Sequence, residues 1–220
     1  MTGVALYDLD RTLLDCNSGR LWAMAEWRAG RITSRDLAWA MGWLVRYGLG
    51  FEGGLHQAME AAATTIVGET EEALDARVRG WFDREVRHRL RPGARASMQR
   101  HRERGDRLVL ATSGSIYAAR AAAEAFGLDE VVATTFEVVD GRFTGRIDIL
   151  AIADGKTAAV REWAERTGAD LARASFYTDS ASDRTLLEVV GDPRVVHPDR
   201  ALRRIAGQKG WPIEDWGASA

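Results

Sequence analysis

Apolar residues change their spacing along the chain, and each change predicts a different kind of element. A short apolar run at 4–7 ends directly at Asp8, which predicts a buried strand with an acid at its tip. From residue 18 to about 89 the apolar positions recur at helical spacing, so this segment is expected to hold helices and no strand. Ser34 is expected to cap the second of these helices, residues 55–67 to form the third, and Thr70 to cap a fourth that ends near residue 88.

After Arg91-Pro92-Gly93 the pattern alternates between helix and strand. Strands are predicted at 107–111, 131–133, 175–177 and 194–196, and helices up to about 104, at 117–126, at 156–167 and from residue 183. Asp140-Gly141 supplies the positive φ of a tight turn and predicts a hairpin at 136–147. We therefore expect an α/β fold in which residues 1–17 and 90–220 form a doubly wound, Rossmann-like parallel sheet. Residues 18–89 are expected to form a small all-helical cap inserted after the first strand.

Composition narrows the possible partners and the location. Thirty Lys and Arg nearly cancel thirty-two Asp and Glu, and a net charge of -2 gives no reason to expect binding to nucleic acid or to an anionic membrane. No apolar run approaches the roughly 20 residues that span a bilayer. Cys16 is the single cysteine and has no partner for an internal disulfide, and Met1 is not followed by a leader-like segment. A cytoplasmic monomer or homodimer is expected.

Four polar sites follow predicted elements at the edge where open α/β sheets bind their ligands. They are Asp8-Leu9-Asp10-Arg11-Thr12, Thr112-Ser113-Gly114, Gly155-Lys156 and Asp179-Ser180-Ala181-Ser182-Asp183. An Asp-x-Asp pair also occurs in the metal sites of glycosyltransferases and in calcium loops. The calcium loop, however, would need Asp or Asn at Thr12 and Gly at Leu13.

In this order, the four sites resemble the signature of the haloacid dehalogenase-like hydrolases, subfamily IB. The helical insert is similar to the small cap of the phosphoserine-phosphatase-like branch of that superfamily. The closing stretch, Val196-His197-Pro198-Asp199 through Trp211-Pro212, resembles the tail of its bacterial members. The resemblance implies a Mg²⁺-dependent phosphatase that acts on a small phosphorylated metabolite.

Each motif then has an expected role in phosphoryl transfer. Asp8 is the expected nucleophile, which forms an aspartyl-phosphate, and Asp10 is the expected general acid and then base. Taken alone, this acidic pair also fits a solvated strand end. The Ser113 hydroxyl and the Gly114 amide are expected to bind phosphate at the start of a helix, with Thr112 as an alternative donor. Lys156 stands at a predicted helix start, where the helix dipole disfavours a cation, and it is expected to bind the phosphate and assist catalysis.

The carboxylates are also the expected metal ligands. Asp8, Asp179 and the backbone carbonyl of Asp10 offer the all-oxygen shell that Mg²⁺ prefers. Asp183 either binds the metal through water or holds Lys156, and its charge also suits a helix N-terminus. The four carboxylates carry -4, Mg²⁺ and Lys156 return +3, and one proton on Asp10 brings the site to zero. Neighbouring carboxylates are therefore expected to raise the pKa of Asp10.

The helical cap is expected to select the substrate. Asn17 stands where phosphoserine phosphatases carry a glutamate for the substrate's amine, so phosphoserine is disfavoured. Candidate substrate contacts in and beside the cap are Asn17, Arg20, Trp22, Trp43, Arg46 and His56. The tryptophans of the cap, Trp22, Trp27, Trp39, Trp43 and Trp81, either pack short helices together or line the substrate entrance. His197 is expected to pack in the tail.

Other functions fit parts of the same pattern. A phosphotransferase or phosphomutase would use the same aspartyl-phosphate with an alcohol in place of water. A non-catalytic phosphate-binding scaffold or signalling receiver needs neither the helical insert nor Asp10. Cleavage of a carbon–halogen bond requires neither Asp10 nor a metal at Asp179.

Overall fold

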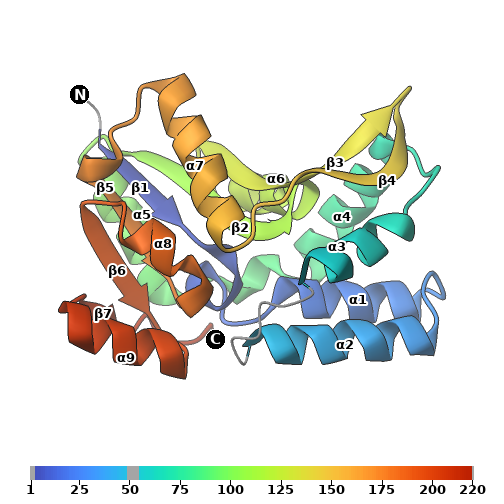
Figure 1. Ribbon diagram of the computed structural model, residues 1–220, viewed down its shortest axis with the longest axis horizontal. Helices are drawn as coiled ribbons and strands as arrows, with labels where there is room; N and C mark the ends of the chain where they lie inside the picture. The colour runs from blue at the N-terminus through green and yellow to red at the C-terminus, as the bar shows by residue number, and fades with distance from the viewer. Residues whose placement is uncertain (1–2, 49–54, 220) are drawn as a thin grey trace.

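A seven-stranded sheet lies at the centre of the molecule (Figure 1). The computed structural model describes residues 3–48 and 55–219, without the side chains of residues 44–48 and 55–58. The strand order is β4-β3-β2-β1-β5-β6-β7, and every neighbouring pair is parallel except β3 and β4. The strands are β1 Val4–Tyr7, β2 Arg107–Ser115, β3 Glu130–Val139, β4 Arg142–Ile149, β5 Ala174–Thr178, β6 Asp192–Val196 and β7 Ile213–Glu214.

Helices cover both faces of this sheet, because side chains of one strand alternate between two apolar clusters. On β1, Ala5 and Tyr7 pack toward α5, α6 and the helix α4 (Glu71–Glu85), whereas Val4 and Leu6 pack toward α7, α8 and α9. The core helices are α5 Pro92–Glu103, α6 Ile116–Phe126, α7 Asp154–Thr167, α8 Arg184–Leu187 and α9 Arg200–Lys209. The predicted doubly wound α/β fold is confirmed.

The insert after β1 is helical, as its apolar spacing predicts. Its helices are α1 Ser18–Arg28, α2 Ser34–Gly48, α3 Leu55–Thr64 and α4 Glu71–Glu85. Figure 1 shows α1 and α2 side by side, away from the sheet, while α4 contributes Leu74, Val78 and Phe82 to the same apolar cluster as α6. The division into a core and a separate cap domain remains a prediction, since one apolar cluster joins α4 to the core.

The β3–β4 hairpin extends away from the sheet and contacts the insert (Figure 1). The amide of Gly68 donates to the carbonyl of Phe143 at 2.9 Å, and the amide of Phe143 donates to the carbonyl of Glu69 at 3.0 Å. Glu71 adds a third backbone bond, to Gly141, at 3.0 Å. The segment between α3 and α4 is therefore hydrogen-bonded to the β3–β4 hairpin, which lies far along the chain from the two points where the insert joins the core.

Several predicted boundaries need correction. Thr33, not Ser34, caps α2: its hydroxyl accepts from the amide of Asp36, whose carboxylate accepts from Thr33 in return. The helix predicted at 55–67 ends at Thr64, and the one predicted to reach residue 88 ends at Glu85, followed by a short 3₁₀ turn, Arg87–Arg89. Thr70 caps α4 as expected, with its hydroxyl accepting from the amide of Ala73.

In the core, β3 is one continuous strand, whereas the sequence predicts a short strand at 131–133 and a separate hairpin that begins at residue 136. Asp140 and Gly141 form the predicted turn, both with positive φ. The sequence analysis predicts neither α9 nor β7, which is only two residues long. No helix in the described part of the chain has both the length and the apolarity needed to cross a membrane.

Candidate active site

Asp8 lies where β1 ends, at the edge of the sheet predicted to bind ligands. Its amide continues the ladder by donating to the carbonyl of Tyr177 at 2.9 Å, which fixes its position beside β5. The chain then makes one wide helical turn, in which Leu14 donates back to Leu9 at 2.9 Å. Inside this turn Arg11 has a φ of 59°, a left-handed backbone conformation that residues other than glycine seldom adopt.

The Asp8 carboxylate is buried and held on both oxygens. Lys156 Nζ donates to Asp8 Oδ1 at 2.9 Å, and Thr12 Oγ1 donates to Asp8 Oδ2 at 3.4 Å. Burial raises the pKa of Asp8 to about 7 against the lowering effect of Lys156.

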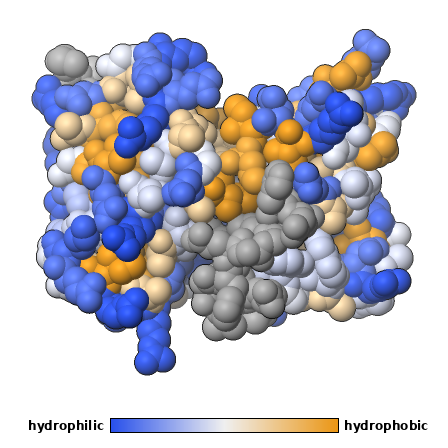
Figure 2. All heavy atoms as spheres, in the orientation of Figure 1, coloured by the Kyte–Doolittle hydropathy of each residue, from blue (hydrophilic) through white to orange (hydrophobic). Residues whose placement is uncertain are grey.

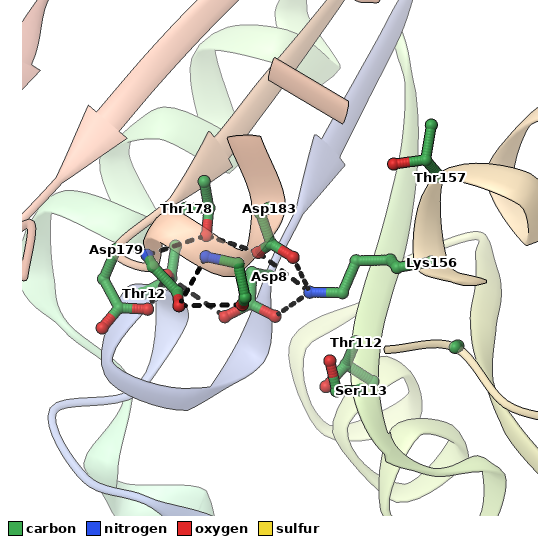
Figure 3. Close-up of polar contacts among 12 residues, drawn as sticks. Asp8, Thr12, Thr112, Ser113, Lys156, Thr157, Thr178, Asp179 and Asp183 are labelled. Carbon is green, nitrogen blue, oxygen red and sulfur yellow. Dashed lines mark hydrogen bonds and ion pairs between the residues drawn. The ribbon is translucent and has the colours of Figure 1, made fainter. Parts of the chain in front are cut away.

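Lys156 crosses from α7 to the strand ends and binds two carboxylates (Figure 3). Its Nζ lies 2.9 Å from Asp8 Oδ1 and 2.9 Å from Asp183 Oδ2, and its side chain is 2% exposed. The helix begins at Asp154, two residues earlier than predicted. Gly155 permits this placement, because a Cβ there would lie 2.2 Å from the Leu150 carbonyl oxygen.

Asp179 and Asp183 follow β5 in one short loop. Thr12 Oγ1 lies between Asp8 and Asp179, at 3.3 Å from Asp179 Oδ1 (Figure 3). Thr178 Oγ1 donates to Asp183 Oδ2 at 2.6 Å, so that Asp183 is fixed by Thr178 and Lys156 together. Burial raises the pKa of Asp179 well above its usual value, and the charge of Asp8 adds to the effect.

The donor set fits a hard cation such as Mg²⁺. Two buried carboxylates, those of Asp8 and Asp179, lie on either side of a single hydroxyl. The charge of Asp8 raises the pKa of Asp179, which is the electrostatic condition that a divalent ion relieves. Within the described residues, no three Asp, Glu, His or Cys side chains converge closely enough to hold a metal by themselves. The remaining ligands would have to be a backbone carbonyl, water or phosphate oxygens, as Mg²⁺ commonly accepts.

Asp10 is fixed by the first turn of the helical insert. The amide of Ser18 donates to Asp10 Oδ1 at 2.7 Å. The pKa of Asp10 is raised, as predicted, but the cause differs: burial raises it, while the Ser18 hydrogen bond and the charge of Arg11 lower it. The carboxyl group of Asp10 therefore keeps its proton to a higher pH than an exposed aspartate does.

The second motif is placed differently from the prediction. Ser113 and Gly114 lie in the last extended residues of β2 rather than at a helix start, and Ser115 is the residue that caps α6. The amide of Gly114 donates to Thr112 Oγ1 at 3.1 Å, so in this structure it is engaged within the motif. Figure 3 shows Thr112 and Ser113 together below Lys156, and the choice of phosphate donor between them stays a prediction.

One cleft brings most of the predicted residues together. The described residues that line it are Asp8, Asp10, Arg11, Asn17, Thr112, Ser113, Gly114, Lys156, Asp179, Ser180, Asp183 and Asp199. In the same orientation as Figure 1, Figure 2 shows a recess at the upper edge of the molecule between the core on the left and the β3–β4 hairpin on the right. All the predicted catalytic, phosphate and metal residues are therefore neighbours.

The predicted substrate contacts are less well supported. Asn17 lines the cleft, but its Oδ1 caps α1 by accepting from the amide of Arg20 at 2.8 Å, and the Arg20 side chain is exposed. Trp22 packs edge-on against Trp81 at 5.1 Å between ring centroids, and Trp43 packs against Trp39 at 6.1 Å. Arg20, Trp22 and Trp43 are absent from the described lining, and the side chains of Arg46 and His56 fall outside the described residues.

Three residues hold parts of the site in place, and the sequence pattern does not predict this role for them. Thr12 bridges Asp8 and Asp179. Asp199 caps α9 through Leu202 and also accepts from the amide of Ala181 at 2.8 Å, which fixes the loop of Asp179 and Asp183. Arg91 donates to the carbonyl of Arg11 at 3.3 Å. Arg91 and Asp199 act through backbone groups distant in sequence, so no local pattern marks them.

Comparisons with known proteins agree with this geometry. Residues 5–188 match the family described as haloacid dehalogenase-like hydrolase. The chain is 31% identical to a phosphoserine phosphatase of Mycobacterium tuberculosis, over 98% of this chain and 71% of the relative, and 25% identical to a histidinol-phosphatase of Neisseria meningitidis, over 97% and 98%.

Solved structures show the same similarity. A protein of unknown function from Bordetella pertussis superimposes with a TM-score of 0.85 at 32% identity, covering 99% of this chain and 100% of that one. A phosphoserine phosphatase solved as an analogue of its phospho-aspartyl intermediate has a TM-score of 0.68 at 17% identity, covering 99% and 95%, which shows a shared fold alone. From the extent of the family match and these relatives, the chain belongs to the haloacid dehalogenase-like hydrolases.

Proposed function

We propose that the protein hydrolyses phosphomonoesters of small metabolites through a phosphorylated Asp8. The observation that carries the proposal is the buried Asp8 carboxylate, fixed by Lys156 and Thr12 in the cleft that Asp10 also lines. An anionic nucleophile meets a phosphate dianion only where positive charge and fixed geometry offset their repulsion. Lys156 supplies the positive charge, and its hydrogen bond fixes the position of the Asp8 oxygen that it binds.

In the first step an Asp8 oxygen forms a bond to phosphorus while the bond from phosphorus to the leaving alcohol breaks. Asp10 donates its proton to that alcohol oxygen, and its raised pKa favours the protonated form that this step needs. In the second step Asp10 takes a proton from water as the water oxygen attacks phosphorus. Inorganic phosphate leaves and the Asp8 carboxylate is regenerated.

The remaining cleft residues would hold the ion and the phosphate. Asp8, Asp179 and the Asp10 carbonyl are the proposed Mg²⁺ ligands, and a bound Mg²⁺ would supply charge neutralisation between the carboxylates and the phosphate. Lys156 and Ser113 are the proposed phosphate-binding side chains. Asp183 is assigned to holding Lys156, since its carboxylate lies 2.9 Å from that ammonium group.

The proposed substrate class rests on the names of two relatives and on whether an acid of the insert lines the cleft, where it could bind an amine of the substrate. Two relatives are named for phosphoserine and for histidinol phosphate, both small amine-bearing monoesters. In this chain Asn17 is the cap of α1, and Glu26, the nearby acid on the same helix, is paired with Arg31 and Arg77. No described acid of the insert lines the cleft, so we propose a substrate whose recognition does not depend on an amine.

The test is phosphate release from a panel of sugar, amino-acid, nucleotide and headgroup monoesters, with Mg²⁺ and with a chelator. Asp8→Asn is expected to lower kcat by roughly 10³-fold or more, and Asp10→Asn by roughly 10²- to 10⁴-fold. Borohydride reduction during turnover should label Asp8 in the wild type and not in Asp8→Asn. The proposal fails if no monoester is hydrolysed or if Asp8→Asn keeps full activity.

Added alcohols separate hydrolysis from phosphoryl transfer to another substrate. A hydrolase releases inorganic phosphate in proportion to the alcohol product even when a second alcohol is present. If the added alcohol captures most of the phosphoryl group at millimolar concentration, the protein is a phosphotransferase that uses the same Asp8 intermediate.

A further inference from the structure

Arg11 is the basic residue of the cleft that the proposed mechanism leaves unused. The described lining holds two basic side chains, Lys156 and Arg11. Lys156 is buried between Asp8 and Asp183, whose two carboxylates more than offset its single positive charge. Arg11 is exposed, and among the described residues its guanidinium makes no hydrogen bond and no ion pair within 4.0 Å.

The backbone of Arg11 is nevertheless held firmly. Its amide donates to the carbonyl of Cys16 at 3.0 Å, and its carbonyl accepts from the buried Arg91. Its φ of 59° would suit glycine better than arginine. An arginine in this conformation therefore costs stability that a glycine would not, while the rigid backbone gives its side chain a fixed origin at the mouth of the cleft.

The chain itself places Arg11 beside Asp10. Arg11 directly follows Asp10, and both residues line the cleft. Asp10 protonates the leaving alcohol in the proposed mechanism, so Arg11 borders the space that this alcohol would occupy. Lys156 is the basic residue that is hydrogen-bonded to Asp8.

We infer that Arg11 is a specificity-determining residue that binds an anionic group on the leaving alcohol, such as a carboxylate one or two carbons from the ester oxygen. This inference rests on the proposed phosphatase function and adds a recognition element to it. A guanidinium with free donors pairs with a carboxylate through two parallel hydrogen bonds, which fixes both position and orientation. A monoester without that anion would leave Arg11 in solvent.

The experiment compares ester pairs that differ in the carboxylate. 3-Phosphoglycerate and glycerol 3-phosphate form one pair, and phosphoserine and phosphoethanolamine form another, in which both members carry the amine. Arg11→Gln is expected to lower the ratio of kcat/KM for the acid over its partner by roughly tenfold to a hundredfold in both pairs, the value of one charged hydrogen-bonded contact. Arg11→Lys, which keeps the charge, should retain a larger share of the ratio than Arg11→Gln.

Two controls separate recognition from folding. Arg11→Gly removes the side chain and relieves the left-handed strain, so its thermal stability should equal or exceed that of the wild type while the ratio still falls. Arg35→Gln removes an exposed arginine on α2 and should leave the ratio unchanged. As a binding readout, glycerate should compete with the best substrate of the panel more strongly than glycerol, and this difference should disappear in Arg11→Gln.

The possible outcomes separate the role of Arg11 from the proposed phosphatase function. If Arg11→Gln slows both members of each pair equally, Arg11 serves the phosphoryl group or the loop, and the specificity inference is wrong while the phosphatase assignment stands. If the wild type hydrolyses no monoester, the proposed function fails and the inference fails with it.

Discussion

Gly155 and Lys156 show how much of the site depends on single positions. Lys156 reaches Asp8 because the first turn of α7 packs directly on the carbonyl of Leu150, an approach that leaves no room for a side chain at Gly155. The sequence marks this pair only by a lysine where the helix dipole disfavours one. The structure adds the physical reason for the glycine that precedes it.

Gly155→Ala is expected to displace Lys156. Its Cβ would lie 2.2 Å from the Leu150 carbonyl oxygen, so the helix start has to shift, at a cost of about 1–3 kcal/mol of unfolding free energy. A shift of this kind in the group that binds Asp8, the proposed nucleophile, should lower kcat by on the order of 10²-fold. Chemical denaturation and phosphate release measure the two effects.

Gly207→Ala is the matched control, because Gly207 lies in α9 with open space where a Cβ would be. It should raise stability by roughly 0.5–1 kcal/mol, as alanine does in an exposed helix interior. If Gly155→Ala behaved like Gly207→Ala, the close approach at Leu150 would not govern the position of Lys156.

At this scale the sequence identifies the residues of the site but not their supports. Asp8, Asp10, Lys156, Asp179 and Asp183 follow predicted elements and are found around one cleft. The sequence does not predict the residues that hold these side chains in place, because their contacts join segments far apart in the chain. Thr12 is recognised only once Asp179 lies beside Asp8. Asn17 caps α1 as well as lining the cleft, and its contact with substrate stays a prediction.

At the scale of elements, the β3–β4 hairpin is the least expected connection. The sequence predicts its turn but interrupts β3 at the polar pair Thr134 and Thr135. Thr134 is fully buried, donates to the Ser113 carbonyl and accepts from the amide of Ala151, so a polar side chain continues the strand through the core. Hydrophobic spacing alone cannot distinguish such a residue from one in a loop.

The contact between hairpin and insert predicts a pattern of amide exchange. The amides of Gly68, Glu71 and Phe143 are hydrogen-bonded across the two segments and should exchange slowly. Gly145→Ala should speed all three together, because Gly145 has a φ of 86° and its new Cβ would lie 2.5 Å from Val67 Cγ2. Hydrogen–deuterium exchange followed by mass spectrometry measures the change.

Gly30→Ala separates the clash from the backbone strain. Gly30 also has a positive φ, 70°, but nothing lies within 4 Å of its added Cβ. It should destabilise the protein locally without exposing the three hairpin amides. Equal loss of protection in both variants would show that the hairpin is not docked through Gly145 and Val67.

At the scale of the whole molecule, stability depends on a buried histidine under the sheet. His101 Nδ1 lies 2.8 Å from Asp106 Oδ2, and His101 Nε2 lies 3.0 Å from the Tyr177 hydroxyl. Burial lowers the pKa of His101 below 6.5, with Asp106 opposing and Arg104 reinforcing the effect. The folded protein therefore binds a proton at His101 less readily than the unfolded chain does.

The sign of the pH dependence follows. Above pH 6.5 His101 is neutral in both states and its pKa shift costs nothing, whereas below that value the unfolded chain gains the proton first and the free energy of unfolding falls. The slope from this residue approaches about 1.4 kcal/mol per pH unit. Urea unfolding at pH 7.5 and 5.5 should show a smaller difference for His101→Gln than for the wild type.

His88 provides the control for this measurement. It is exposed, and His88→Gln should leave the pH dependence unchanged. His197 also has a pKa lowered mainly by burial, so part of the fall in stability at low pH should survive in His101→Gln and become smaller when both residues are replaced. An unchanged slope in His101→Gln would show that His101 is protonated equally in both states.

The tail after β7 has a consequence for the order in which the protein matures. Trp216 packs on Tyr177 and leaves no space at Gly93, Arg91 donates to the carbonyl of Gly217, and Ser219 donates to Asp15 at the end of the Asp8 loop. In the chain, Asp8 comes before nearly all of the described residues, whereas the segment that braces its loop comes after nearly all of them. During synthesis the loop of Asp8, the proposed nucleophile, therefore leaves the ribosome long before its support, and the cleft can assemble fully only after residue 219 has emerged.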